Sequence, residues 1–171
     1  MQALLKTWLD LALLRRGPGD LPDSVTLFGL AACAYLSAGA LQAWLIYGGD
    51  RLAERILADL ALVLLPVWIL LRATGRGHRY NQTTSAMLGV GALLGPVVVP
   101  LLWLSGPAER FPVLGLVLYG ASVGLILWYT LAIGHILRSA LDLGRLAGVA
   151  IAATYLLGTA TVLTRLFPSE G

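Results

Sequence analysis

The chain has 171 residues, of which 58% are apolar and only 12% charged, and its formal net charge is +3. A water-soluble domain carries about 25% charged residues, so this chain has too few to cover a water-facing surface. Its basic residues are spread over short segments between apolar runs, without the clustered basic face that nucleic-acid binding requires. The composition therefore excludes a soluble domain and a nucleic-acid partner, and it indicates an integral membrane protein.

Residues 2–16 predict a short amphipathic helix. Gln2, Lys6 and Asp10 fall on one side of a helical wheel, and apolar residues including Trp8 occupy the rest. The apolar run is shorter than the roughly 20 residues that span a hydrocarbon core. We expect this helix to lie in the membrane interface with Trp8 at headgroup depth, and packing of the helix beneath the bundle is the alternative.

Five apolar runs follow, each long enough to span a membrane. They cover residues 25–47, 52–71, 84–104, 113–137 and 146–166. Asp23 or Ser24 can cap the first of them. We therefore predict an all-α integral membrane bundle of five transmembrane helices. Residues 1–23 form a cytoplasmic interfacial helix and turn, and residues 24–171 form one transmembrane domain.

The basic residues predict the orientation of the chain. Eight of the twelve Lys and Arg residues fall on the side of the N-terminus and four on the other side. The positive-inside rule then places the N-terminus inside and the C-terminus outside a bacterial inner membrane. The inner arginines either only set this orientation or also contact anionic lipid or an acidic partner. The candidates for such contacts are Arg15, Arg16, Arg72, Arg76 and Arg79.

Three residues are candidates for a polar site within the membrane. Asp59 lies about two turns into the second span, and Arg55 stands four residues earlier, so the two can pair on one helix face. Such a pair is either an interfacial ion pair with Arg55 reaching outward or a polar site for a lipid headgroup. His135, close to Arg138 at the inner end of the fourth span, is expected to form hydrogen bonds there.

Patterns that indicate catalysis or cofactor binding are missing from the sequence. One cysteine and two histidines without ligand spacing form no metal or haem pattern. The spans hold neither paired carboxylates nor a Ser-His-Asp set. We therefore predict that the protein is not an enzyme and that it holds no cofactor and no metal.

Glycines four residues apart predict close helix packing. Gly91 and Gly95 stand in the third span, and Gly120 and Gly124 stand in the fourth. The G-x-x-x-G spacing lets two helix backbones approach each other. Packing within the bundle and association with a second copy or another membrane protein are both compatible with it.

The layout of residues 1–167 resembles the Yip (Ypt-interacting protein) membrane family and its short bacterial relatives. The resemblance rests on an N-terminal segment followed by five spans with a proline-interrupted middle span, and on the segment from Trp8 to Pro22. The long cytosolic arm of the eukaryotic members is missing. The resemblance implies a membrane adaptor or membrane-shaping role without catalysis, and it assigns no site residues.

We expect a non-enzymatic adaptor, scaffold or assembly subunit that acts through its helix faces and basic loops. The scarcity of charges in mid-membrane favours this function, because proton- and ion-coupled carriers usually hold one there. Its partners would be the lipid bilayer, with anionic lipid at the inner face, and other membrane proteins or a second copy. The alternative is a small transporter, channel or lipid-translocating protein, with Pro96 and Pro100 bending or unwinding the third span as a gate.

Overall fold

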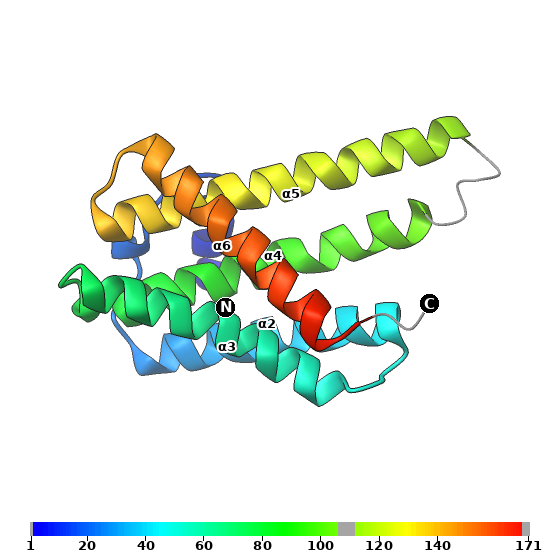
Figure 1. Ribbon diagram of the computed structural model, residues 1–171. Helices are drawn as coiled ribbons and strands as arrows, with labels where there is room; N and C mark the ends of the chain where they lie inside the picture. The colour runs from blue at the N-terminus through cyan, green and yellow to red at the C-terminus, as the bar shows by residue number, and fades with distance from the viewer. Residues whose placement is uncertain (1, 106–111, 169–171) are drawn as a thin grey trace.

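The computed structural model describes residues 2–105 and 112–168, and this part of the chain folds into helices joined by short connections (Figure 1). The α-helices are α1 (Gln2–Ala12), α2 (Val25–Tyr47), α3 (Leu52–Ala73), α4 (Tyr80–Ser105), α5 (Pro112–Leu141) and α6 (Arg145–Leu166). Two 3-10 helices, η1 (Pro18–Asp20) and η2 (Gly77–Arg79), lie in the connections. The predicted all-α class is confirmed.

Four of the described helices are long and apolar enough to cross a membrane. These segments are Val25–Ile46, Leu52–Ala73, Val113–Leu141 and Arg145–Leu166. Several helices of this kind are expected of a multi-pass membrane protein. The sequence predicted five spans, and the predicted third span lies in α4, which is not among the four. Several side chains near the end of α4 lie outside the described residues.

Local sequence sets both ends of α2. Ser24 is the N-cap, and its Oγ accepts a hydrogen bond from the backbone N–H of Leu27 at 3.4 Å. Asp23, the other predicted cap, instead accepts a hydrogen bond from Asn81 Nδ2 at 2.9 Å. The helix ends at Gly48, whose φ of +66° is the left-handed conformation that glycine adopts without a steric penalty.

Helix α4 lies at the centre of the bundle and contacts α1, α2, α3 and α5. All residues from 83 to 91 of this helix are buried. The helix continues through Pro96 and Pro100, so the predicted local unwinding is not found. A proline removes one backbone hydrogen bond, but the bonds formed by the neighbouring residues remain available to hold the helix together.

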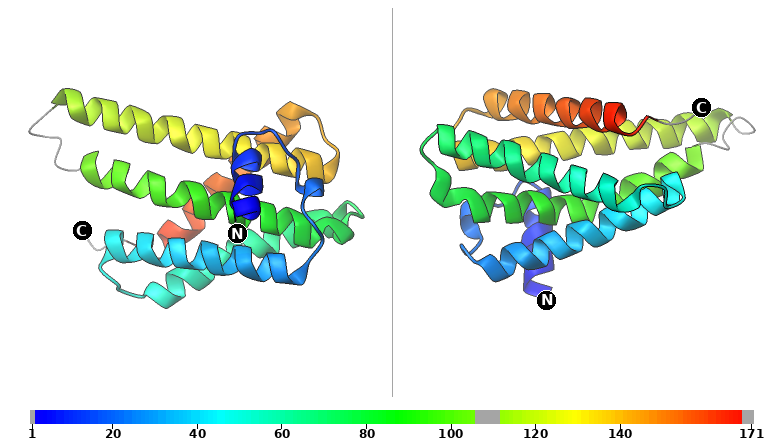
Figure 2. Two further views of the ribbon diagram at one scale, coloured as in Figure 1. Left: turned by 180° about the vertical axis from the view of Figure 1, so that it is seen from behind. Right: turned by 60° about the horizontal axis from the view of Figure 1, so that its bottom comes forward.

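Helix α1 crosses α4 and α5 transversely (Figure 2). Trp8 is only 6% exposed, and its indole lies directly on Gly89 of α4. Trp128 of α5 donates a hydrogen bond from Nε1 to the carbonyl oxygen of Ala12 at 2.9 Å. Trp8 is thus packed against α4, as in the alternative, in which the helix packs on the bundle, and its expected position at headgroup depth stays a prediction. The helix also ends at Ala12, before residue 16, because the backbone turns at Leu14 with a φ of +60°.

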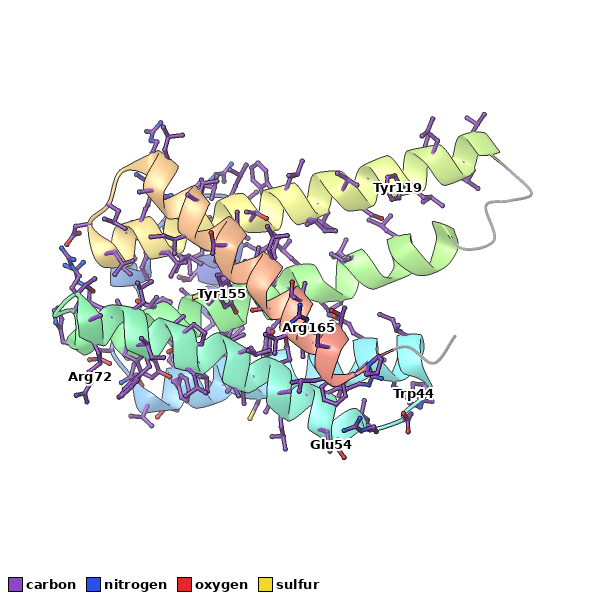
Figure 3. All side chains as sticks on the ribbon, viewed as in Figure 1. Trp44, Glu54, Arg72, Tyr119, Tyr155 and Arg165 are labelled. Carbon is purple, nitrogen blue, oxygen red and sulfur yellow. The ribbon has the colours of Figure 1, made fainter. Side chains whose placement is uncertain are left out.

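The bundle has two ends that differ in structure. The closed end comprises α1, η1 and η2 together with the starts of α2, α4 and α6 and the ends of α3 and α5. The open end comprises the α2–α3 turn, the end of α4, the start of α5 and the end of α6. Arg72 marks the closed end in Figure 3, and Trp44 and Glu54 mark the open end.

Candidate functional site

A cavity of about 420 Å³ lies among the five long helices, between the middle of the bundle and the open end. Six polar side chains line it: Tyr35 and Gln42 from α2, Arg55 and Asp59 from α3, Tyr129 from α5 and Thr164 from α6. The remaining walls are mostly apolar, with Gly91 and Gly95 of α4 on one side. This volume and this mixture of apolar walls with a few polar groups are typical of sites for small molecules.

A hydrogen bond between Tyr35 and Asp59 lies at the deep end of the cavity. The Tyr35 hydroxyl donates to Asp59 Oδ2 at 2.6 Å. Asp59 is the eighth residue of α3, so it lies about 10 Å along the helix axis from the first residue. An O–H···O bond of this length is typical of a donor to a carboxylate. The bond therefore holds an acidic group in place in the interior of the bundle.

Two more tyrosines gather around this bond. A Cβ added to Gly91 would lie 2.6 Å from the ring of Tyr35 and 3.4 Å from the hydroxyl of Tyr129, so both side chains pack where α4 has no side chain. Tyr155 of α6, labelled in Figure 3, packs against the same hydrophobic core as Tyr35 and Tyr129. The cluster thus combines one carboxyl group with three phenol rings.

Arg55 lines the cavity nearer to the open end. Its guanidinium carbon lies 4.9 Å from the ring centroid of Phe167, and that of Arg51 lies at the same distance. Phe167 is buried at the end of α6, so these cation–π contacts connect α6 with the start of α3. Arg55 and Asp59 do share one face of α3, as the sequence predicted, but the hydrogen bond of Asp59 to Tyr35 was not foreseen.

His135 lies at the closed end and does not line this cavity. Its Nε2 donates to the carbonyl oxygen of Arg16 at 3.0 Å, and its Nδ1 accepts from Arg138 Nε at 3.3 Å. The residue therefore ties α5 to the segment after α1, in the hydrogen-bonding position expected for it. It does not join Asp59 and Arg55 in one site.

Two arginines of the predicted lipid-contacting group bind within the protein. Arg79 Nη1 donates to the carbonyl oxygens of Ser139 at 3.3 Å and Ala140 at 3.0 Å and to the Asp142 carboxylate at 3.1 Å. Arg76 Nε lies 3.3 Å from the same carboxylate. The hydrogen bond from Arg79 lowers the pKa of Asp142 below its ordinary value, and the nearby positive charges add to this effect. These contacts join the α3–α4 connection to the end of α5.

The other arginines of that group differ from one another. Arg16 Nε lies 3.4 Å from Asp10 Oδ2, and Arg15 is exposed. Arg72 is exposed and its guanidinium carbon lies 5.1 Å from the centroid of a Trp68 ring. Among the predicted contacts, Arg15 and Arg72 therefore present the most accessible charges at the closed end.

The predicted glycine pairs differ in their surroundings. Gly91 and Gly95 of α4 meet α2, where the ring of Tyr35 and the amide of Gln42 lie directly on them. A Cβ added to Gly120 or Gly124 of α5 would meet no described residue within 4 Å. Both pairs were predicted from the same G-x-x-x-G spacing, but only Gly91 and Gly95 pack against another helix within the described chain.

Comparison with protein-family models, with curated proteins and with solved structures finds no match. The resemblance to the Yip family therefore stays a prediction from layout. Among the described residues, no three His, Cys, Asp or Glu side chains are grouped so that they could hold a metal ion.

The tyrosines of the cluster were missed in the sequence. None of Tyr35, Tyr129 and Tyr155 is among the predicted site residues, yet Tyr35 and Tyr129 line the cavity and all three pack against the core. A signal was available, because tyrosine in membrane helices concentrates at the two interfaces. Tyr35 and Tyr155 stand near the middle of their spans, and this position favours a polar partner inside the bundle.

Proposed function

We propose that this protein binds a small polar or amphipathic ligand in the cavity near the open end and carries it through the membrane. The observation that supports this function is the hydrogen-bonded pair Tyr35–Asp59 in the wall of a cavity of about 420 Å³. An acidic side chain within a membrane domain is costly, and it commonly marks a path for a substrate or an ion. The alternative function from the sequence, a small transporter or lipid-translocating protein, is thus placed ahead of the adaptor.

The proposal includes the membrane topology. Helix α4, with 26 residues, is about 39 Å long and exceeds the roughly 30 Å of a hydrocarbon core, so we take it as the fifth span. The basic closed end would then face the cytoplasm, in keeping with the positive-inside rule. In this orientation the cavity occupies the outer half of the membrane. Ligand would enter from the outer side, and a change in the packing around α4 would be needed to release it inward.

A cavity-filling substitution tests the proposed function. Gly39 of α2 lines the cavity, and an added Cβ meets no described atom within 4 Å, so Gly39→Leu should occupy ligand space without disturbing the helix. Gly29→Leu is the matched control, because it lies on the same helix with the same free space but outside the cavity. Both variants and the native protein would be reconstituted into liposomes.

The flux assay uses defined probes. Radiolabelled ethanolamine, phosphate and O-phosphoethanolamine report on solutes, and fluorescent phosphatidylethanolamine with dithionite quenching reports on lipid translocation. We expect the native protein and Gly29→Leu to move at least one probe faster than empty liposomes, and Gly39→Leu to lose that flux. If no probe moves, or if Gly39→Leu matches the native rate, the proposed function is wrong.

An adaptor or self-association function is the second candidate, supported by the glycines of α5. Gly120 and Gly124 meet no described residue within 4 Å, and the exposed large residues Leu116, Val117 and Tyr119 stand beside them. A G-x-x-x-G surface of this kind allows a second helix to approach closely. If it does, Gly120→Leu and Gly124→Leu should abolish a crosslinked dimer in membranes, and Gly158→Leu on α6 should not. A dimer that survives both α5 substitutions would exclude this surface.

A further inference from the structure

A second cavity, of about 450 Å³, lies at the closed end and shares no lining residue with the cavity near the open end. It lies where α2 begins, where α3 ends and where the α3–α4 connection leads into α4. Its walls are mostly polar, and its lining residues include Asp23, Trp68, Arg72, His78, Tyr80 and Asn81. This closed-end cavity takes no part in the proposed function.

Two residues of the closed-end cavity offer hydrogen-bond donors to an anion. The Arg72 guanidinium lies over the ring of Trp68, with its central carbon 5.1 Å from the ring centroid. This contact uses the flat face of the group, and the N–H bonds along its edge match the oxygens of a phosphate. Toward the rest of the described chain, the Arg72 side chain makes no hydrogen bond or ion pair. The ring of His78 adds one N–H donor in either neutral tautomer.

Asp23 adds a negative charge to the same cavity. Its Oδ1 accepts a hydrogen bond from Asn81 Nδ2 at 2.9 Å, which ties the carboxylate to the start of α4. A carboxylate repels a phosphate and attracts an ammonium group. The charges of Arg72 and Asp23 therefore match a ligand that carries both a phosphate and an ammonium group better than a ligand that carries the phosphate alone.

An apolar stripe on α3 leads along the membrane to the closed-end cavity. Trp68, Ile69 and Arg72 stand three, four and seven residues after Leu65, so the four side chains share one face of the helix. Leu65 is 59% exposed and Ile69 is 58% exposed, and the stripe is about 10 Å long. Tryptophan is enriched at the headgroup level of a membrane. The stripe therefore suits acyl chains at Leu65 and Ile69 and a headgroup beyond Trp68, in the cavity.

We infer that the closed-end cavity binds the headgroup of phosphatidylethanolamine. The phosphate would lie at Arg72 and His78, the ammonium group at Asp23, and the acyl chains on the α3 stripe. Basic cavities between membrane helices on the cytoplasmic side bind lipid headgroups in this way, and the closed end faces the cytoplasm in the proposed orientation. The bound lipid would join the starts of α2 and α4 to the end of α3, and it would stabilise this end of the bundle.

The headgroup is tested with two lipids that have the same short acyl chains. Phosphatidylethanolamine carries the phosphate and the ammonium group, and phosphatidylglycerol carries only the phosphate. Dissociation constants are measured in detergent by native mass spectrometry. We expect that of phosphatidylethanolamine to be about 10-fold lower, as for one additional hydrogen bond between charged groups. A dissociation constant for phosphatidylglycerol that is equal or lower would overturn the inference.

The Gly39→Leu variant shows which of the two cavities binds the lipid. Gly39 lines the cavity near the open end and not the closed-end cavity. The variant should therefore bind phosphatidylethanolamine with the native dissociation constant. Loss of this binding would place the lipid in the other cavity and would contradict the inference.

Two substitutions should change lipid binding in different ways. Arg72→Gln removes the charged partner of the phosphate, so both lipids should bind about 10-fold more weakly. Asp23→Asn keeps an acceptor for Asn81 but removes the negative charge, so the preference for phosphatidylethanolamine should be lost. Arg15→Gln is the matched control, because Arg15 is also exposed at the closed end but lies outside the cavity. The assignment is wrong if Arg15→Gln weakens binding as much as Arg72→Gln, or if Asp23→Asn keeps the preference.

Thermal unfolding in detergent checks that the variants fold and measures the effect of the lipid. Arg72 and Asp23 are exposed, so both variants should unfold at the native temperature when no lipid is added. Phosphatidylethanolamine at 100 times its dissociation constant should raise the unfolding temperature of the native protein by about 5 °C or more. The same concentration should raise that of Arg72→Gln by about half as much. No rise in the native protein, or an equal rise in the variant, would count against the inference.

O-phosphoethanolamine distinguishes a lipid from a free solute. It carries the phosphate and the ammonium group without acyl chains, so it cannot contact the α3 stripe. We expect it to bind at least about 10-fold more weakly than phosphatidylethanolamine, because burial of acyl carbons contributes to binding. Equal binding would show that the stripe is not used, and the assignment to a lipid would be wrong. These outcomes concern the closed-end cavity alone, and the proposed transport function is tested separately by the flux of Gly39→Leu.

Discussion

At the closed end, side chains from distant parts of the chain bond to one another and to backbone carbonyls, whereas at the open end the helices surround a cavity. Arg79, in the α3–α4 connection, donates a hydrogen bond to the end of α5, and Trp128 of α5 donates one to the end of α1. At the open end, two arginines stack on Phe167, and Asp59 lines the cavity of about 420 Å³. The closed end is joined by these hydrogen bonds between distant segments, and the open end surrounds the cavity that is lined by all five long helices.

This difference separates stability from binding. A helix bundle in a membrane is held together by close packing and by interhelical hydrogen bonds, because lipid tails are as apolar as the side chains they contact. Both are dense at the closed end. Substitutions there should mainly lower the free energy of unfolding, and substitutions around the cavity should mainly change ligand binding.

The largest loss of stability is expected where α5 and α6 cross. A Cβ added to Gly148 would lie 2.6 Å from the carbonyl oxygen of Gly134, and backbone cannot move aside as a flexible side chain can. Gly148→Leu should therefore lower the free energy of unfolding by about 3 kcal/mol, the upper part of the usual range for overpacking. Thermal unfolding in detergent measures the loss. Gly158→Leu on α6, where an added Cβ meets nothing within 4 Å, should change it by less than about 0.5 kcal/mol. Equal losses would contradict the close crossing.

The next largest effect is expected at Arg79. Arg79→Gln removes the hydrogen bonds to Ser139, Ala140 and Asp142. The carbonyl oxygens lose a charged donor in a partly buried place, and we expect a loss of about 1–3 kcal/mol. Denaturation by guanidinium in detergent is the measurement. Arg72→Gln is the control, since Arg72 is exposed and stacks on Trp68 of its own helix. A similar loss in both variants would show that the contacts of Arg79 are not what holds the closed end together.

A smaller effect is expected on acidification. The Arg79 hydrogen bond lowers the pKa of Asp142 from its ordinary value of 3.8. A carboxyl group with a lowered pKa in the folded state stabilises the fold above its unfolded pKa, and this contribution is lost as the pH falls through the folded pKa. The unfolding temperature should therefore drop below about pH 4, and the drop should be smaller in Asp142→Asn. An unchanged acid profile in that variant would assign the drop to other carboxyl groups.

The sequence predicted where each helix begins and ends better than which face of the helix points into the bundle. The length of each apolar run and the Ser24 cap are local signals, and they placed the helix ends within a few residues. The contact between Tyr35 and Asp59 joins positions 24 residues apart on separate helices, and it depends on which face each helix turns inward. Spans that are apolar all round carry little information on that rotation. The contacts of Arg79 also join positions that are distant in sequence. Its charge was therefore expected only to set the orientation of the chain or to contact anionic lipid or an acidic partner.

The smallest effect on stability is expected at the cavity itself. Tyr35→Phe keeps the ring on Gly91 and removes only the hydroxyl that donates to Asp59. Because the carboxyl group faces a cavity of about 420 Å³, water can replace the lost donor, and the free energy of unfolding should fall by about 1 kcal/mol or less. The same variant should nevertheless slow the flux of the probe that the native protein moves, since the Tyr35 hydroxyl fixes the direction in which Asp59 offers its oxygens to the cavity. A loss as large as that of Arg79→Gln would mean that the Tyr35–Asp59 bond holds the bundle together. The distinction between a stabilising closed end and a ligand-binding open end would then be lost.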